Sequence, residues 1–275
     1  MLQFSVNPEL CIQCGACSGD CPTGIITMIA TGPVIAADKE SLCYRCQHCL
    51  AVCPTGALSI LGLQPENSIA LASRLPSPEQ MAALIKGRRS VRHYAEEDLA
   101  PELIAHLLET AWHAPTGVNA RQVRFTVIDT RAKLQRFRET IFQGLAELGE
   151  SKTLPAHMER FLPFVQAWRE EQKDIIFRDA PHLVLASAPK DAPTPVQDCL
   201  IALSYLELYA QSCKVGTVWA GLAYLAVEAL LPRLRMMLEL PENHQIGYAM
   251  LFGKPAVRYA RGVQHENAPI HHASC

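Results

Sequence analysis

The sequence of 275 residues predicts two α+β units, a small cysteine-rich unit followed by a larger unit of mixed helices and strands. Eight of its 11 cysteines lie at or before residue 53, whereas the chain beyond residue 77 alternates between helical and short extended patterns. Helices and strands are mixed there without regular βαβ order, which favours an α+β sheet over a doubly wound one. We therefore expect a first domain over 1–63, a linker over 64–77 and a second domain over 78–275.

Two copies of one cysteine spacing organise the first unit. Each copy reads C-x2-C-x2-C-x3-C-P, and the eight cysteines are Cys11, Cys14, Cys17, Cys21, Cys43, Cys46, Cys49 and Cys53. Between the copies, two short apolar segments on either side of Gly32-Pro33 predict a β-hairpin, Ile25 to Ile29 and Val34 to Ala36. A matching strand, Leu58 to Leu61, follows the second copy, so each half of the unit repeats the other.

This spacing is the bacterial ferredoxin run, in which three thiolates of one copy and the fourth of the other copy hold each 4Fe-4S cluster. The sequence therefore predicts two such clusters, held by Cys11, Cys14, Cys17 and Cys53 and by Cys43, Cys46, Cys49 and Cys21. Zinc sites usually use separated ligand pairs, and neither zinc nor a disulfide framework explains the doubled Cys-Pro ending. A core of about sixty residues is marginal by itself, so cluster ligation should supply much of the folding energy.

Helical and extended patterns follow one another along the second unit. Ser77 is placed to cap a helix whose first position is Pro78, and this helix is predicted to reach about Gly87. A helix over 101–113 has its apolar residues on one stripe. The remaining predicted elements are a strand over 122–128, helices over 131–148 and 156–173, a strand over 182–188, a helix over 194–212 and a strand over 246–252. The helix over 194–212 is mostly apolar all round, which indicates burial in a core or an interface.

Charge and hydropathy exclude several classes of protein. A formal net charge of -2 gives no global field that would attract nucleic acid or an anionic membrane. The N-terminus, Met1 to Val6, has neither the basic nor the apolar region of a secretory signal. The uncharged stretch Val215 to Val227 is too short to span a bilayer. We expect a cytoplasmic protein that binds neither nucleic acid nor a membrane.

Four cations and a hydroxyl crowd the segment that follows the first helix of the second unit. It reads Lys86-Gly-Arg-Arg-Ser-Val-Arg92. Arginine forks and a serine hydroxyl suit a phosphate monoester, because they donate charge-assisted hydrogen bonds. The alternative is a basic helix end that interacts with the helix dipole and needs no ligand.

Three further segments accompany this basic turn: Ala114-Pro-Thr-Gly-Val-Asn119, Gly216-Thr-Val-Trp-Ala-Gly221 and Tyr248-Ala-Met-Leu-Phe-Gly-Lys-Pro255. In this order and spacing they resemble the FMN-dependent nitroreductase family, and the whole chain resembles its ferredoxin-fused members. The resemblance implies a central, mainly antiparallel sheet flanked by helices, an FMN cofactor, and a homodimer that builds its flavin sites across the subunit interface.

The resemblance also implies which residues bind FMN. Contacts to the ribityl phosphate are expected from Arg88, Arg89, Ser90 and Arg92. The loop that reaches the isoalloxazine ring from the partner subunit matches Pro115, Thr116 and Asn119. The segment beside the reactive edge of the flavin matches Trp219, Ala220 and Gly221, and a C-terminal phosphate contact is expected from either Arg258 or Arg261. The residues after the loop, Arg121-Gln122-Val123, depart from the Gln-Pro-Trp of many shorter members.

A cluster carries one electron at a time, whereas a flavin accepts electrons singly and releases them in pairs. We therefore predict an oxidoreductase that passes electrons from an external reductant through two clusters to FMN, and on to a small planar acceptor such as a nitroaromatic or a quinone. No G-x-G-x-x-G follows a strand, so a protein donor such as reduced ferredoxin is favoured over NAD(P)H. The alternatives are an electron carrier without its own substrate and a redox-sensing regulator. No side chain is predicted to act as a catalytic acid or base.

Overall fold

The structure is a computed structural model that describes residues 1–274. The last residue of the expected second domain, Cys275, lies outside the described residues. The chain divides into two compact units, one made of residues 1–76 with 118–120, the other of residues 77–117 with the chain from 121 onward. Each unit has its own hydrophobic core.

Strand pairing ties the two sequence repeats of the N-terminal unit together. β1 (Ser5–Val6) pairs with β4 (Leu58–Ser59), and β2 (Ile26–Ile29) forms a hairpin with β3 (Gly32–Ile35), both antiparallel. The short helices α1 (Ala16–Gly19) and α2 (His48–Ala51) each begin inside a cysteine run, and 3-10 turns span Ala37–Leu42 and Pro65–Asn67. The strand before the first run therefore pairs with the strand after the second run, and the strand after the first run pairs with the strand before the second. A pseudo-twofold repeat requires this pairing.

The core of the N-terminal unit is small. It consists of eight buried side chains: Leu2, Cys17, Ile25, Ile26, Cys49, Leu50, Leu58 and Ile60. Two of the eight are cysteines of the runs, so the apolar core is continuous with the proposed ligands. A unit of this size buries little apolar surface and is only marginally stable without a metal or another cross-link.

The C-terminal unit begins with two helices and then builds a sheet. Its helices are α3 (Pro78–Gly87), α4 (Pro101–Ala111), α5 (Arg131–Glu150), α6 (Leu162–Glu171), α7 (Pro195–Ser212), α8 (Gly221–Ala229) and α9 (Leu231–Leu234). Its strands are β5 (Arg124–Ile128), β6 (His182–Pro189), β7 (Gly216–Trp219) and β8 (His244–Gly253), and a 3-10 turn spans Ala156–Phe161. A further 3-10 turn, Gly117–Asn119, begins in this unit, and its residues 118–119 belong to the first unit. A capping box formed by Ser77 and Gln80 starts α3 where the sequence predicts it.

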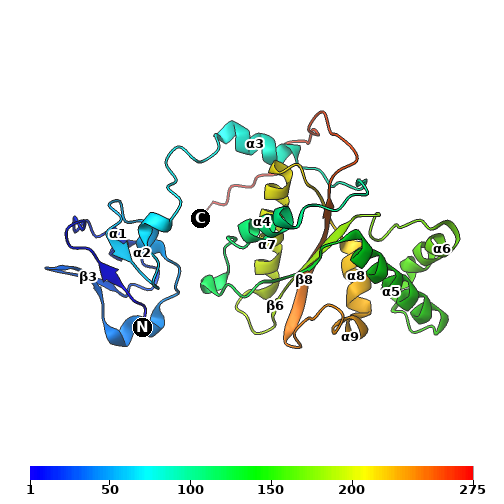
Figure 1. Cartoon of the computed structure of the whole chain (residues 1–275), viewed down its shortest axis with the longest axis horizontal. Helices are drawn as coiled ribbons and strands as arrows, with labels where there is room; N and C mark the ends of the chain where they lie inside the picture. The colour runs from blue at the N-terminus through cyan, green and yellow to red at the C-terminus, as the bar shows by residue number, and fades with distance from the viewer. Residues whose placement is uncertain (275) are drawn as a thin grey trace. The chain divides into compact units, whose positions relative to one another are not determined.

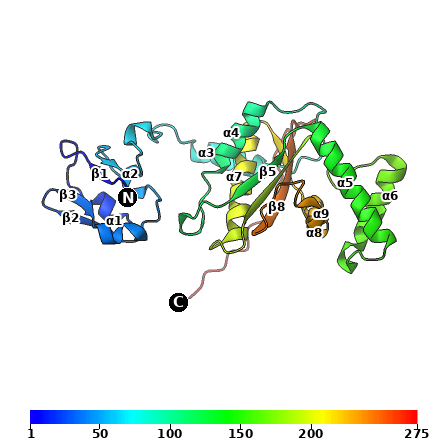
Figure 2. The same ribbon diagram turned by 60° about the horizontal axis from the view of Figure 1, so that its bottom comes forward.

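All neighbouring strands of the sheet are antiparallel, in the order β5-β6-β8-β7. Helices α4 and α7 cover one face, and α5 and α8 cover the other, as the two views of Figures 1 and 2 agree. Beyond β7, Ser90 forms a parallel bridge with Thr217, which brings the segment after α3 to this edge. At the opposite edge, β5 has no further strand partner among residues 1–274.

Alternation along β6 divides the core of the C-terminal unit into two layers. Leu183 and Leu185 pack in the layer formed with α5, α6 and α8. Val184 and Ala186 point to the other face and pack in the layer formed with α4 and α7. Because helices cover both faces, β6 is buried from residue 182 to 188.

The expected fold class is confirmed, including the mainly antiparallel sheet flanked by helices. Sequence patterns missed β7 and α8, because β7 and most of α8 lie in one uncharged stretch, 215–227, without a strong turn signal. The helix expected over 156–173 is a 3-10 turn followed by α6, since Pro163 favours a new helix start. Within residues 1–274 no helix combines the length and the hydropathy that a membrane crossing requires.

Candidate functional site

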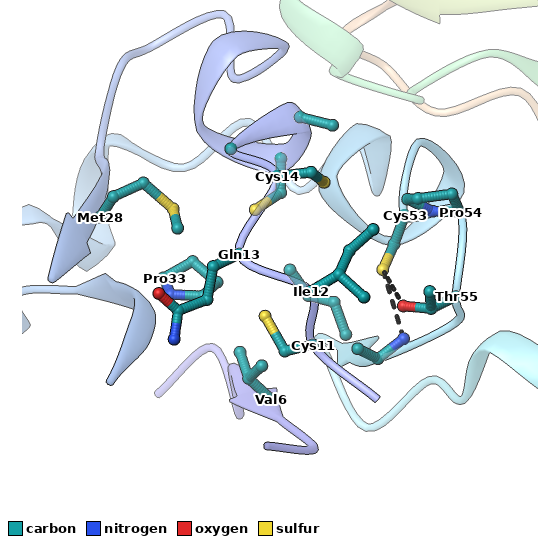
Figure 3. A pocket seen from close by; sticks show the side chains of 15 residues that line it. Val6, Cys11, Ile12, Gln13, Cys14, Met28, Pro33, Cys53, Pro54 and Thr55 are labelled. Carbon is teal, nitrogen blue, oxygen red and sulfur yellow. Dashed lines mark hydrogen bonds between the residues drawn. The ribbon is translucent and has the colours of Figure 1, made fainter. Parts of the chain in front are cut away.

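The eight cysteines of the two runs line two separate hollows. The first hollow is lined by Cys11, Cys14, Cys17 and Cys53 (Figure 3). The second is lined by Cys43, Cys46, Cys49 and Cys21. In both cases three cysteines come from one run and the fourth from the other, which is the grouping that the spacing predicts. Four sulfur donors around a compact hollow are the donor set of a 4Fe-4S cluster.

Left-handed backbone residues curve each run around its hollow. In the first run Gln13 and Gly15 have φ of 53° and 74°, and in the second run Arg45 and Gln47 have φ of 54° and 62°. These are the same positions in the repeat, two and four residues after the first cysteine. Three of the four carry side chains, for which this conformation is costly, so the loop is held by the fold around it.

In both repeats, the surroundings shift the pKa of the third cysteine and that of the fourth cysteine in opposite directions. Burial raises the pKa of Cys17, and it raises the pKa of Cys49 to about 11. Burial acts in the same direction on Cys21 and Cys53, but hydrogen bonds lower the pKa of both. For Cys53 the donors include the Ala57 N–H at 3.2 Å and the Thr55 hydroxyl (Figure 3). Hydrogen bonds therefore favour the thiolate, the form that binds iron, more at the fourth cysteines, Cys21 and Cys53, than burial allows at Cys17 and Cys49.

In the C-terminal unit, the basic turn lies against strand β7. The Val91 N–H donates to the Thr217 carbonyl at 2.9 Å, and Ser90 bridges the same residue. A Cβ on Gly216 would lie 2.8 Å from the Val91 side chain, so the close approach requires glycine there. The Tyr94 hydroxyl donates to the Val91 carbonyl at 2.8 Å and fixes the far end of the turn.

The arginines of the turn have different surroundings. Arg89 folds back onto the end of α3, where it donates to the carbonyls of Lys86 and Gly87. It thereby acts as the basic helix end that the sequence left open as an alternative. Arg92 is exposed and makes only a long contact, 3.4 Å, with the Ser90 carbonyl. Of these two side chains, Arg92 keeps more donors available to a phosphate.

Arg88 is paired with a buried carboxylate that the sequence did not single out. Glu207 of α7 is 6% exposed, and its Oε1 accepts from Arg88 Nη1 at 2.9 Å. Its Oε2 accepts from Trp219 Nε1 at 3.0 Å. One carboxylate therefore joins the basic turn to the segment expected beside the flavin. The only signal in the sequence was an acid within an otherwise apolar helix.

A second buried acid of α7 holds the loop that begins at Ala114. Asp198 is 3% exposed, and its Oδ1 accepts from the Gly117 N–H at 3.0 Å and from the Thr194 hydroxyl at 2.8 Å. A Cβ on Gly117 would lie 2.2 Å from the Thr194 hydroxyl oxygen. Only glycine therefore allows the loop to reach this carboxylate. Sequence reasoning also missed Asp198.

The same loop is held in an unusual conformation. Val118, Asn119 and Arg121 have φ of 47°, 56° and 51°, a left-handed region that costs free energy for side-chain-bearing residues. Thr116 accepts from the Arg121 N–H at 3.0 Å. The Arg121 guanidinium donates to the Trp112 carbonyl at 2.7 Å and lies 4.9 Å from the centre of its indole ring. Arg121, which departs from the family pattern, thus fixes the loop that carries Pro115, Thr116 and Asn119.

Trp219, Ala220 and Gly221 lie where β7 passes into α8. The Trp219 ring is 5.5 Å from the ring of Tyr248. A Cβ on Gly221 would lie 2.9 Å from the Tyr248 hydroxyl, so this residue must be small. The Ala220 N–H donates to the Ala249 carbonyl at 3.0 Å, so the segment is fixed at the start of a helix, next to aromatic rings that suit a planar ligand.

The two C-terminal arginines lie beyond β8. Both Arg258 and Arg261 are exposed. Gly262 approaches the Lys86 carbonyl, with a built Cβ 3.5 Å from that oxygen, so the chain next to Arg261 passes the basic turn. Both residues remain candidates for the second phosphate contact.

Comparisons with known proteins match a family to each of the two units. Residues 85–254 match the nitroreductase family, and residues 10–58 match the 4Fe-4S dicluster domain. The first match covers more than half of the chain and contains the basic turn, both buried acids of α7 and the segment after β7. Arg258 and Arg261 lie outside it.

Individual relatives are distant. A protein of Methanothermobacter thermautotrophicus, provisionally named NADH dehydrogenase/NAD(P)H nitroreductase, is 28% identical over 177 residues, which are 62% of this chain and 75% of that protein. The FMN-bound nitroreductase of Bacteroides fragilis superposes with a TM-score of 0.57 at 20% identity, covering 71% of this chain and 99% of that one. An FMN-dependent nitroreductase of Mycobacterium smegmatis in complex with NADPH gives a TM-score of 0.50 at 20% identity, covering 66% and 90%. At such identities the likeness to the solved structures shows the fold alone.

Proposed function

Because the chain belongs to the nitroreductase family and carries a match to the 4Fe-4S dicluster domain before it, we propose an iron-sulfur flavoenzyme that relays electrons to a small acceptor. Electrons from an external reductant would pass through two 4Fe-4S clusters to FMN, and on to a planar acceptor such as a nitroaromatic or a quinone. Membership of this family supports an oxidoreductase. The electron donor, the electron acceptor and the path through two clusters are what we propose in addition.

One observation carries the proposal: two hollows, each with four cysteine sulfurs, occur in the same chain as the nitroreductase domain. When bound, the clusters exchange single electrons and FMN exchanges one or two, so together they convert between the two kinds of transfer. The chain's residues fit both groups. Thiols suit iron, the basic turn suits a phosphate, and the aromatic rings beside Gly221 suit a planar ring.

Three segments of the C-terminal unit would hold FMN. Arg88, Ser90 and Arg92 would bind the phosphate, because a guanidinium keeps several N–H donors even when one of them bonds to a carboxylate. The segment at Gly221 would contact the ring of the same FMN, and the strained loop with Thr116 would reach the ring of the FMN bound to the partner subunit. No acid or base among these residues is assigned a catalytic role, because the transfers are the cofactor's chemistry.

A protein donor such as reduced ferredoxin is proposed, with NAD(P)H as the second candidate. The dicluster domain favours the first, since it would receive single electrons. The name of the archaeal relative and the NADPH complex of the mycobacterial enzyme favour the second. Rapid mixing of anaerobic protein with each donor distinguishes them, because only the physiological donor should bleach the cluster bands within the time of one turnover.

A homodimer is also proposed, with α7 at its interface. Ile201 and Tyr205, one helical turn apart, are 36% and 45% exposed, which leaves an apolar face next to the buried side of the helix. Light scattering on apoprotein should give a dimer before FMN is added. A monomer at micromolar concentration that binds FMN with undiminished affinity would contradict a site shared between subunits.

Turnover by anaerobically purified protein tests the function as a whole. Its visible spectrum should contain both flavin and iron-sulfur bands, and a quinone or nitroaromatic should be reduced over many cycles. If the protein passes on only the electrons that it already holds and does not turn over, it is an electron carrier without its own substrate.

A further inference from the structure

The three segments proposed for FMN are all hydrogen-bonded to one helix through two buried carboxylates. Asp198 holds the loop at Gly117. Glu207, nine residues further along α7, holds Arg88 and Trp219. The loop, the basic turn and the segment after β7 are far apart in the sequence, and Arg88 is 119 residues from Glu207. A single element therefore sets their relative positions.

Glu207 is fully engaged by these two partners. Each of its oxygens accepts from a different segment, at 2.9 Å from Arg88 and at 3.0 Å from Trp219. A buried carboxylate is costly unless it is paired and hydrogen-bonded, so displacement of either partner leaves it uncompensated. The positions of the guanidinium and the indole are therefore linked through one charged group.

We propose that Glu207 is a positioning residue that presents Arg88 to the FMN phosphate and couples this contact to Trp219 at the flavin edge. The inference rests on the proposed flavin site. Arg88 uses Nη1 for Glu207, and its remaining N–H groups stay available to a phosphate. Holding the long side chain in one geometry before binding removes the cost of ordering it later. Without the carboxylate, Arg88 would sample many rotamers on its partly exposed side.

The Glu207→Gln variant tests the proposal, because glutamine keeps the shape and has only one acceptor oxygen for two donors. Flavin titrations of apoprotein should show FMN binding weakened about tenfold and riboflavin binding changed less than about threefold. Asp198→Asn is the matched control, a second buried acid of the same helix that touches neither Arg88 nor Trp219. It should change FMN and riboflavin affinity by the same factor.

An unchanged ratio of FMN to riboflavin affinity in Glu207→Gln would show that Glu207 only supports the fold, whatever happens to the melting temperature. Equal or tighter FMN binding would overturn the proposal as well. If wild-type apoprotein binds neither flavin, the proposed flavin function itself fails, and this outcome is visible before any variant is compared.

A second measurement needs neither flavin nor a Glu207 variant. Inorganic phosphate bound at Arg88 should alter the emission of Trp219 through their shared carboxylate. The response should disappear in Trp219→Phe, which retains Trp112 and Trp168. A phosphate response that persists in this variant, or no response in the wild type, would contradict the coupling.

Discussion

The two units of the chain are stabilised in different ways. The N-terminal unit has a core of eight buried side chains, two of them cysteines expected to bind iron. The C-terminal unit buries a full layer of apolar side chains on each face of its sheet. In the first unit the proposed ligands are part of the core, whereas in the second the proposed FMN contacts lie on segments attached to a finished core.

This difference indicates how each unit depends on its cofactor. A small unit of this kind folds only when its metal is bound, so removing the clusters removes folding free energy. Removing a ligand from segments that surround a complete core costs only the binding free energy. The clusters should therefore be structural as well as functional, and FMN should be functional only.

The largest expected effect is the unfolding of the N-terminal unit when both clusters are lost. Anaerobic chelation, or Cys17→Ser combined with Cys49→Ser, should unfold the N-terminal unit and leave the C-terminal unit intact, because each unit has its own core. Limited proteolysis should then digest the first seventy or so residues and leave a stable fragment. A protease-resistant N-terminal unit without iron would show that the comparison is wrong.

Loss of one cluster sharpens the comparison within the N-terminal unit. Intact protein should contain about eight irons per chain, and Cys53→Ser should retain about four. The retained cluster should be the one held by Cys43, Cys46, Cys49 and Cys21, because Cys53 lines the other hollow. Cys21→Ser is the matched control and should lose the opposite cluster, as paramagnetic resonance of the reduced proteins would show. Loss of the same cluster in both variants would contradict the exchange of fourth ligands.

Removal of the phosphate contact tests the C-terminal unit. Arg88→Ala should weaken FMN binding about ten- to a hundredfold, since a charge-assisted hydrogen bond contributes roughly 1.5 to 3 kcal/mol. Riboflavin, which lacks the phosphate, should bind wild type and variant with similar affinity. Arg89→Ala is the comparison variant, because Arg89 caps α3 and should alter FMN affinity little. Equal FMN affinity of wild type and Arg88→Ala in a flavin titration would remove the phosphate-site assignment.

The smallest effect is a pH dependence confined to the C-terminal unit. Burial lowers the pKa of His182, against the smaller opposing influence of Asp98 and Asp129, and its neutral Nε2 accepts from the Leu99 N–H at 2.9 Å. The unfolded state, with a pKa near 6.5, then binds the proton more readily than the folded state. Stability is therefore complete above about pH 6.5 and declines as the pH falls toward the folded pKa, by at most about 1.4 kcal/mol per pH unit.

Thermal melts of the C-terminal transition between pH 8 and pH 5 measure this slope. His182→Gln keeps an acceptor for Leu99 without a titrating group, so the slope should become smaller. Burial lowers the pKa of His244 as well, and this residue should account for part of the remaining slope. A slope that does not change in His182→Gln would exclude His182 as its source.

The N-terminal unit was predictable because its information is local. Three of the four cysteines around each hollow lie within seven residues of one another, and the repeated Cys-Pro-Thr places a threonine hydroxyl near Cys21 and near Cys53. The hairpin was also predicted, but its turn lies at residues 30–31, and Gly32 and Pro33 belong to β3. The pairing of β1 with β4 was not predicted, because it joins segments more than fifty residues apart.

The proposed flavin site was predicted only where it carries a sequence motif. Arg88, Ser90 and the segment at Gly221 were named from such motifs, whereas Glu207 and Asp198 were not. Asp198 accepts from Gly117, 81 positions away, and Glu207 accepts from Arg88, 119 positions away. Their role therefore depends on the fold rather than on any local pattern. For the same reason the sequence did not reveal that Arg89 would fold back onto α3.

Each hollow takes its fourth cysteine from the other run, and this exchange decides which hollow is completed first during synthesis. The second hollow has all four of its cysteines once Cys49 has been made, whereas the first must wait for Cys53. The site whose first ligands emerge earliest from the ribosome is therefore completed last. At about 5 to 20 residues per second, both sites become complete within about a second of each other.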